Sequence, residues 1–147
     1  AAASQRVMSA PPLPSDVKAA IAAYHPAARA RFMDMREIVH AAAADTPEIG
    51  PLTETLKWGE PAYLTEASGS GITLRVAWKP GDPDRIGVYL NCRTSLVEDI
   101  RTLHPGAFEI EGTRGLMLAI DGPLPTEALD HVARLAQGYH RRKRGKP

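Results

Sequence analysis

The stretch ITLRVAWKPGDPDRIGVYLNCR, residues 72–93, decides the fold of this chain. In each half, apolar and polar residues alternate, which is the spacing of a β-strand with one dry face. A break rich in Pro, Gly and Asp separates the halves over residues 80–84. Two such strands joined by a short turn predict an antiparallel hairpin. Cys92 falls in the apolar set of the second strand, which favours a buried, inert thiol over a nucleophile.

More strands and helices are predicted on either side of this hairpin. One strand is expected over residues 56–65, where Pro61 restricts it to a sheet edge or a bulge, and two more over 108–111 and 116–120. Apolar stripes at steps of three and four predict helices over residues 27–44 and 126–139, while a capping serine at Ser15 and a capping box at 95–98 predict helices over 16–24 and 95–103. Because tight turns rather than long helical crossovers separate the strands, the sheet is expected to be antiparallel. The expected fold is therefore α+β in two layers, a sheet of about five strands with the N- and C-terminal helices packed on one face.

Length and composition set the domain organisation. The 147 residues suit a single domain, assigned to residues 15–139, with a mobile lead-in over 1–14 and a basic tail over 140–147. The 44% of apolar and 24% of charged residues exclude a disordered chain, and a single cysteine excludes a disulfide framework. No apolar stretch is long enough to span a bilayer and no secretory signal is visible, so a cytoplasmic location is expected.

Charge is unevenly distributed along the chain. Five of the 18 Lys and Arg residues lie in the tail, so the remainder holds 13 basic against 17 acidic residues. A solvated, solubilising end is the favoured interpretation of the tail. Association with nucleic acid through the phosphates is the alternative.

Metal-ligating and nucleophilic motifs are scarce. The five histidines include no pair three or four residues apart, and neither a nucleophile elbow nor a phosphate loop is present. Glu109 and Glu111 share one face of a predicted strand and are the candidates for a cation site, although a solvent-facing strand edge is the favoured explanation. No cofactor is expected, and an enzyme is disfavoured. The least implausible catalytic assignment is proton transfer by Glu60 beside Tyr63.

The wet face of the predicted sheet carries the strongest candidate site. Arg75, Tyr89 and Arg93 project from the same side of adjacent strands and suit a small polar or anionic ligand. The polar face of any antiparallel sheet offers the alternative explanation. A neighbouring edge adds further candidates, namely Lys57, Trp58, Glu60 and Tyr63.

The segment Lys57-Trp58-Gly59-Glu60-Pro61-Ala62-Tyr63 resembles the signature of the YdhG-like family, small bacterial proteins with a domain of unknown function. The similarity extends in order through the hairpin to the turn at Gly112-Thr113-Arg114-Gly115, which adds Arg114 to the candidate ligand-binding residues. The resemblance implies an α+β fold with a curved antiparallel sheet. Some relatives are described as frataxin-like iron-handling proteins, but no catalytic residues are established that transfer to this chain.

The sequence therefore indicates three candidate functions. The first is a non-enzymatic module that binds a small molecule or a protein through the candidate residues. The second is frataxin-like handling of iron or another cation, and the third is nucleic-acid association through the tail. The chain is expected to be a monomer or a homodimer, the latter through pairing of an exposed strand at 56–65 or 116–120.

Overall fold

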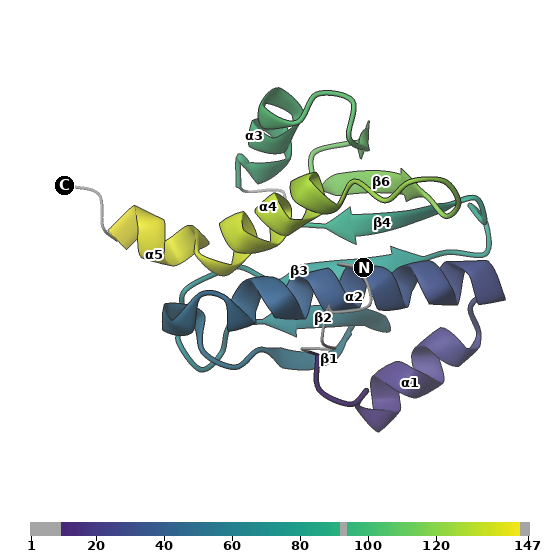
Figure 1. The fold of residues 1–147 in the computed structure, drawn as a ribbon, viewed down its shortest axis with the longest axis horizontal. Helices are drawn as coiled ribbons and strands as arrows, with labels where there is room; N and C mark the ends of the chain where they lie inside the picture. The colour runs from purple at the N-terminus through teal and green to yellow at the C-terminus, as the bar shows by residue number, and fades with distance from the viewer. Residues whose placement is uncertain (1–9, 92–93, 145–147) are drawn as a thin grey trace, which may run out of the picture.

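A computed structural model describes residues 10–91 and 94–144 and shows an α+β fold with one open antiparallel sheet (Figure 1). Its strands lie in the order β1-β2-β3-β4-β6-β5. Their bounds are β1 Thr53–Lys57, β2 Glu60–Leu64, β3 Leu74–Trp78, β4 Arg85–Tyr89, β5 Glu109–Glu111 and β6 Gly115–Ala119. The predicted hairpin is confirmed as β3 and β4, in which Arg75 lies opposite Tyr89.

The sheet has one strand more than the sequence predicted. The segment 56–65, expected as a single strand, belongs to a hairpin in which Lys57 of β1 pairs with Glu60 of β2. Pro61 is accommodated within β2, opposite Leu56 of the edge strand β1. The segment 116–120 was expected as an exposed edge, but β6 lies inside the sheet between β4 and β5.

The helices α1 to α4 pack on one face of the sheet, as predicted, and α5 continues beyond its end (Figure 1). Their bounds are α1 Ser15–Ala22, α2 Pro26–Ala44, the 3-10 turn η2 Pro47–Ile49, α3 Leu96–Leu103, α4 Thr126–Gln137 and α5 Tyr139–Arg144. The long helix α2 begins at Pro26, whose missing N–H costs nothing in a first turn, and His25 Nδ1 accepts the N–H of Ala27 at 3.2 Å. Phe32, Met35 and Val39 of α2 are buried against the sheet and α4.

Burial of apolar side chains between these helices and the sheet supplies the main stabilisation of the fold. From the sheet the core receives Leu74 and Val76 of β3, Ile86 and Val88 of β4, and Leu116 of β6. From α4 it receives Leu129 and Val132. Among residues 10–91 and 94–144, no helical layer covers the opposite face of the sheet.

Both ends of the described chain are more structured than the sequence suggested. Before α1, the N–H of Ala10 donates to Glu37 and the carbonyl of Pro11 accepts from Arg36. The first half of the tail continues as the helix α5, in which residues 140–144 are exposed to solvent. Among the described residues, no helix combines the length and apolar character needed to cross a bilayer.

Candidate functional site

The open face of the sheet is hollowed because its strands carry small residues at adjoining positions. Ala62, Ala77, Gly87 and Gly115 are all buried there, so the larger side chains at the periphery surround a depression. Tyr89 lies over Gly87: a Cβ at that position would be 2.8 Å from the tyrosine ring and 2.7 Å from the Met117 sulfur. A glycine is thus required for the tyrosine ring to lie down on the sheet.

A groove of about 440 Å³ and an adjoining one of about 630 Å³ occupy this face. Five residues predicted from the sequence line the first groove: Lys57, Trp58, Arg75, Tyr89 and Arg114. All of these except Lys57 also line the second, together with Lys79 and the turn at 111–113. We name these two joined depressions the open-face groove.

Trp58 lies at the tip of the β1-β2 hairpin with 90% of its surface exposed. Both residues of the two-residue turn have positive φ, +56° at Trp58 and +75° at Gly59, as a type I′ turn requires. Gly59 adopts this conformation without strain, but Trp58 does not, since an aromatic residue at positive φ is uncommon. Strain at such a position is a pointer to function.

Cations surround the Tyr89 ring. Arg75 lies 5.4 Å and Lys79 4.9 Å from the ring centroid, within the range of cation–π attraction. Glu60 forms an ion pair with Arg75, and its other carboxylate oxygen is 4.0 Å from Lys79. The carboxylate therefore holds the two cations beside the ring, and it offsets part of their charge.

Lys57 and Arg114 supply positive charge that forms no ion pair with the described residues. Both side chains are exposed, and within residues 10–91 and 94–144 no carboxylate lies within 4.0 Å of either. His140, at the start of α5, lines the same groove. The arrangement suits a ligand that has an anionic group for the cations and a planar group for the exposed indole.

The structure separates Tyr63 from the other candidates. It is 2% exposed, lies on the helical face of the sheet, and donates its hydroxyl to Glu54 at 2.8 Å. Glu60 instead points to the open face, so the predicted proton-transfer pair of Glu60 and Tyr63 is not assembled. Arg93 and Cys92 lie outside the described residues.

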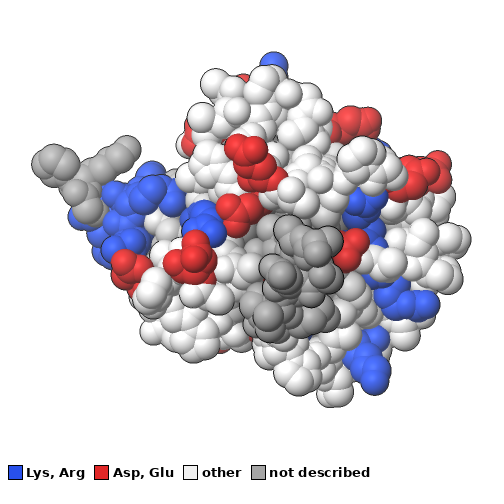
Figure 2. Space-filling view, viewed as in Figure 1, with Lys and Arg blue, Asp and Glu red and all other residues white. Residues whose placement is uncertain are grey.

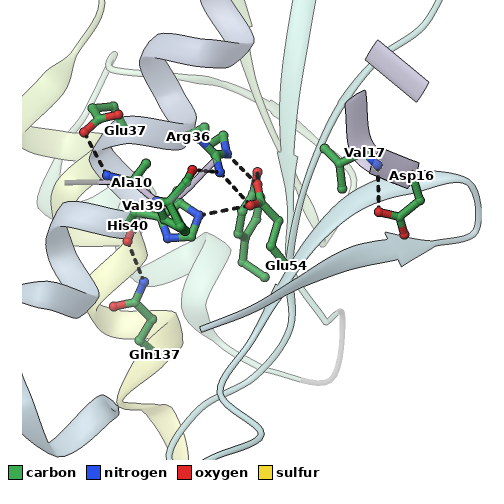
Figure 3. A network of polar contacts seen from close by, with 11 residues as sticks. Ala10, Asp16, Val17, Arg36, Glu37, Val39, His40, Glu54 and Gln137 are labelled. Atoms are coloured by element: carbon green, nitrogen blue, oxygen red, sulfur yellow. Dashed lines mark hydrogen bonds and ion pairs between the residues drawn. The ribbon is translucent and has the colours of Figure 1, made fainter. Parts of the chain in front are cut away.

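Glu54 is the centre of a buried polar network beneath β1 (Figure 3). Its carboxylate accepts two hydrogen bonds from Arg36, at 2.6 and 2.7 Å, and one from Tyr63, and it lies 3.4 Å from His40 Nε2. Burial acts to raise the pKa of Glu54, but the hydrogen bonds from Arg36 and Tyr63 and the nearby His40 imidazole outweigh it and lower the pKa from 4.5 to about 2. Burial and the neighbouring carboxylate raise the pKa of Tyr63.

This network predicts a pH dependence of stability. Because the folded-state pKa of Glu54 is lowered, its contribution is fully present above about pH 4.5 and is lost as the pH falls towards 2. The lowering of the Glu54 pKa from 4.5 to about 2 corresponds to about 3 kcal/mol of unfolding free energy. Urea unfolding of the wild type and of Glu54→Gln at pH 7, 5 and 3 measures it, and we expect the stability gap between the two proteins to narrow with acid. A gap that is constant with pH would contradict the assignment.

The candidate cation ligands Glu109 and Glu111 both point at Arg85. Its guanidinium lies 3.0 Å from Glu109 and 2.9 Å from Glu111. A guanidinium in this position competes with a bound cation, so the geometry disfavours iron handling at this pair. In the part of the chain that the structure describes, no group of three or more His, Cys, Asp or Glu side chains is arranged to hold a metal ion.

Tertiary structure also assembles groups that sequence spacing did not connect. His104 and His131 are 27 residues apart, yet their Nε2 and Nδ1 atoms share a hydrogen bond of 2.8 Å. His140 was assigned to the tail, and nothing in its local sequence indicates that it lines the groove. Only the position of α5 beside the loop at 70–73 brings it there.

Comparisons with protein-family models, curated proteins and solved structures give no significant match to this chain.

Proposed function

We propose that the protein is a binding module, without catalytic activity of its own, whose open-face groove binds a small anion that carries a planar ring. One observation carries this proposal: Lys57, Trp58, Arg75, Tyr89 and Arg114 come from distant parts of the chain yet line one groove. The YdhG-like resemblance and the cytoplasmic location are part of the same proposal, and both rest on the sequence.

The residue at the hairpin tip supports a ligand with a planar ring. Asn-Gly is the preferred pair for a type I′ turn, so folding alone favours asparagine over tryptophan at position 58. The exposed indole contributes little to the core, because 90% of its surface is open to solvent. Stacking on a ligand ring would bury that surface.

The substitution Trp58→Asn removes the indole but keeps a residue that favours the type I′ turn. We expect the variant to fold with unchanged or slightly raised thermal stability and to bind AMP at least about tenfold more weakly, because stacking of a base on an aromatic side chain contributes about 1–3 kcal/mol. Isothermal titration calorimetry with AMP measures the affinity, and inorganic phosphate and adenosine test the two halves of the probe.

Trp78→Phe is the matched control, because Trp78 lies on the helical face and its indole N–H donates to the Pro83 carbonyl. It should bind AMP like the wild type. Equal affinity of Trp58→Asn and the wild type for AMP, or no binding by either protein, would refute the proposed function.

A further inference from the structure

The helix α5 extends the positive charge of the open-face groove beyond the size of a small ligand. His140 lines the groove beside Gly71 and Thr73. Arg144 lies one helical turn further on, so it shares a face of α5 with His140. Its guanidinium is 3.4 Å from the carbonyl of Gly69, in the loop that leads into the groove.

Contacts with the body of the protein hold α5 in this position. The N–H of Arg141 donates to the carbonyl of Ser70 at 3.0 Å, and the Ser70 hydroxyl donates to the carbonyl of Gln137 at 2.7 Å. The loop and the helix are thereby fixed together. Figure 2 shows the Lys and Arg side chains of α5 gathered at this end of the molecule.

The other arginines of α5 point elsewhere. The Arg141 guanidinium lies 3.6 Å from Glu48, and Arg142 donates to the carbonyl of Leu135 at 2.8 Å. The cation that continues the groove is thus Arg144, on the His140 face of α5. It forms one track with Lys57 and Arg114, which we name the cationic track.

We infer that the groove and the cationic track together bind single-stranded nucleic acid, a deepening that rests on the proposed function. An exposed indole stacks on an unpaired base, whereas the bases of a duplex are already stacked on one another. The six residues of α5 span about 9 Å along the helix axis. The cationic track is therefore long enough to contact a phosphate backbone beyond the first nucleotide. A positively charged groove with an aromatic platform is the general arrangement of proteins that bind single strands without sequence preference.

The test compares oligonucleotides with a mononucleotide. Trp78→Phe leaves Trp58 as the remaining tryptophan of the two in the chain, so its fluorescence reports stacking directly. We expect U10 or dT10 to quench it and to bind at least about tenfold more tightly than UMP. Phosphate contacts with Lys57, Arg114 and Arg144 predict that log K falls against log salt with a slope of about −2.

Two variants of α5 locate the contact. Arg144→Gln should weaken U10 binding about fivefold and make the salt slope shallower by about 0.7, while leaving UMP binding unchanged. Arg141→Gln removes the same charge from the side that faces Glu48, and it should leave both the affinity and the slope near wild type.

Each contrary result has a distinct meaning. If U10 and dT10 bind no more tightly than UMP, this inference is overturned while the proposed function stands. Inorganic polyphosphate of ten units that binds as tightly as U10 would show a polyanion site without base recognition and would also overturn it. Absence of binding by UMP and AMP alike would instead remove the proposed function. Comparison of U10 with dT10 identifies which nucleic acid is preferred.

Discussion

Glu54→Gln is expected to lower the free energy of unfolding at pH 7 by about 3–5 kcal/mol. The carboxylate is 4% exposed and the Arg36 guanidinium opposite it is 3% exposed. In glutamine one of the two carboxylate oxygens is replaced by an NH2 group, which cannot accept a hydrogen bond, so the bidentate pair with Arg36 is lost and the guanidinium remains buried without a counter-charge. The single amide oxygen would then have to serve donors that two carboxylate oxygens accept from in the wild type, those of Arg36 and the hydroxyl of Tyr63. Urea unfolding with linear extrapolation measures the difference.

Glu98→Gln is the matched control for this prediction. It also removes one carboxylate from an arginine pair, but Glu98 and Arg101 are both more than 60% exposed and 3.3 Å apart. Surface ion pairs contribute about 0–1 kcal/mol, so this variant should be close to wild type. Similar losses of unfolding free energy in Glu54→Gln and Glu98→Gln would show that burial does not make the Glu54–Arg36 pair more stabilising than a surface ion pair.

The buried network also bears on the open-face groove. Arg36 and His40 come from α2, Glu54 from β1 and Tyr63 from β2, so the network ties the β1-β2 hairpin to the long helix. The tip of that hairpin carries Trp58. A rigid hairpin positions the indole with less loss of conformational entropy on binding than a mobile loop does. The buried Glu54 network on the helical face of the sheet thus supports ligand binding on the open face.

The course of the chain at residues 57–60 explains which parts of the groove the sequence could predict. In one continuous strand, residues 57 and 63 are an even number of positions apart and share a face. A two-residue turn instead pairs Lys57 with Glu60, so the even-numbered residues of β2 accompany Lys57 and Tyr63 faces the helices. The sequence predicts a single strand here because the turn carries a tryptophan where Asn or Asp is usual.

Other parts of the site depend on tertiary contacts alone. The pairing of Arg75 with Tyr89 followed from the hairpin, because its turn is short and both strands alternate clearly. Arg114 reaches the groove because β6 pairs with β4, with Gly115 opposite Tyr89. His140 reaches it through the packing of α5 on the loop at 69–73. Local periodicity carries no information on either placement.

Charge reversal at both free cations of the groove should have the largest effect on ligand binding. For the Lys57→Glu, Arg114→Glu double variant, we expect AMP affinity to fall about 1,000-fold, because two contacts each change by about 2 kcal/mol. Each contact of two unit charges at 4 Å in a water-like environment is worth about 1 kcal/mol, and reversal turns attraction into repulsion. The variant should fold normally, because both side chains are exposed and no carboxylate of the described residues pairs with them.

The Lys18→Glu, Arg101→Glu double variant separates a local effect from one of net charge. It changes the charge of the protein by the same amount, but both side chains are exposed on the helical face, in α1 and α3. Charges further away than about 8 Å are largely screened at physiological ionic strength, so this protein should bind AMP within about twofold of wild type. Equal losses in the two double variants would assign the attraction to net charge and would remove Lys57 and Arg114 from the site. Loss in the groove variant alone places the anionic part of the ligand between the hairpin tip and the turn at 112–114.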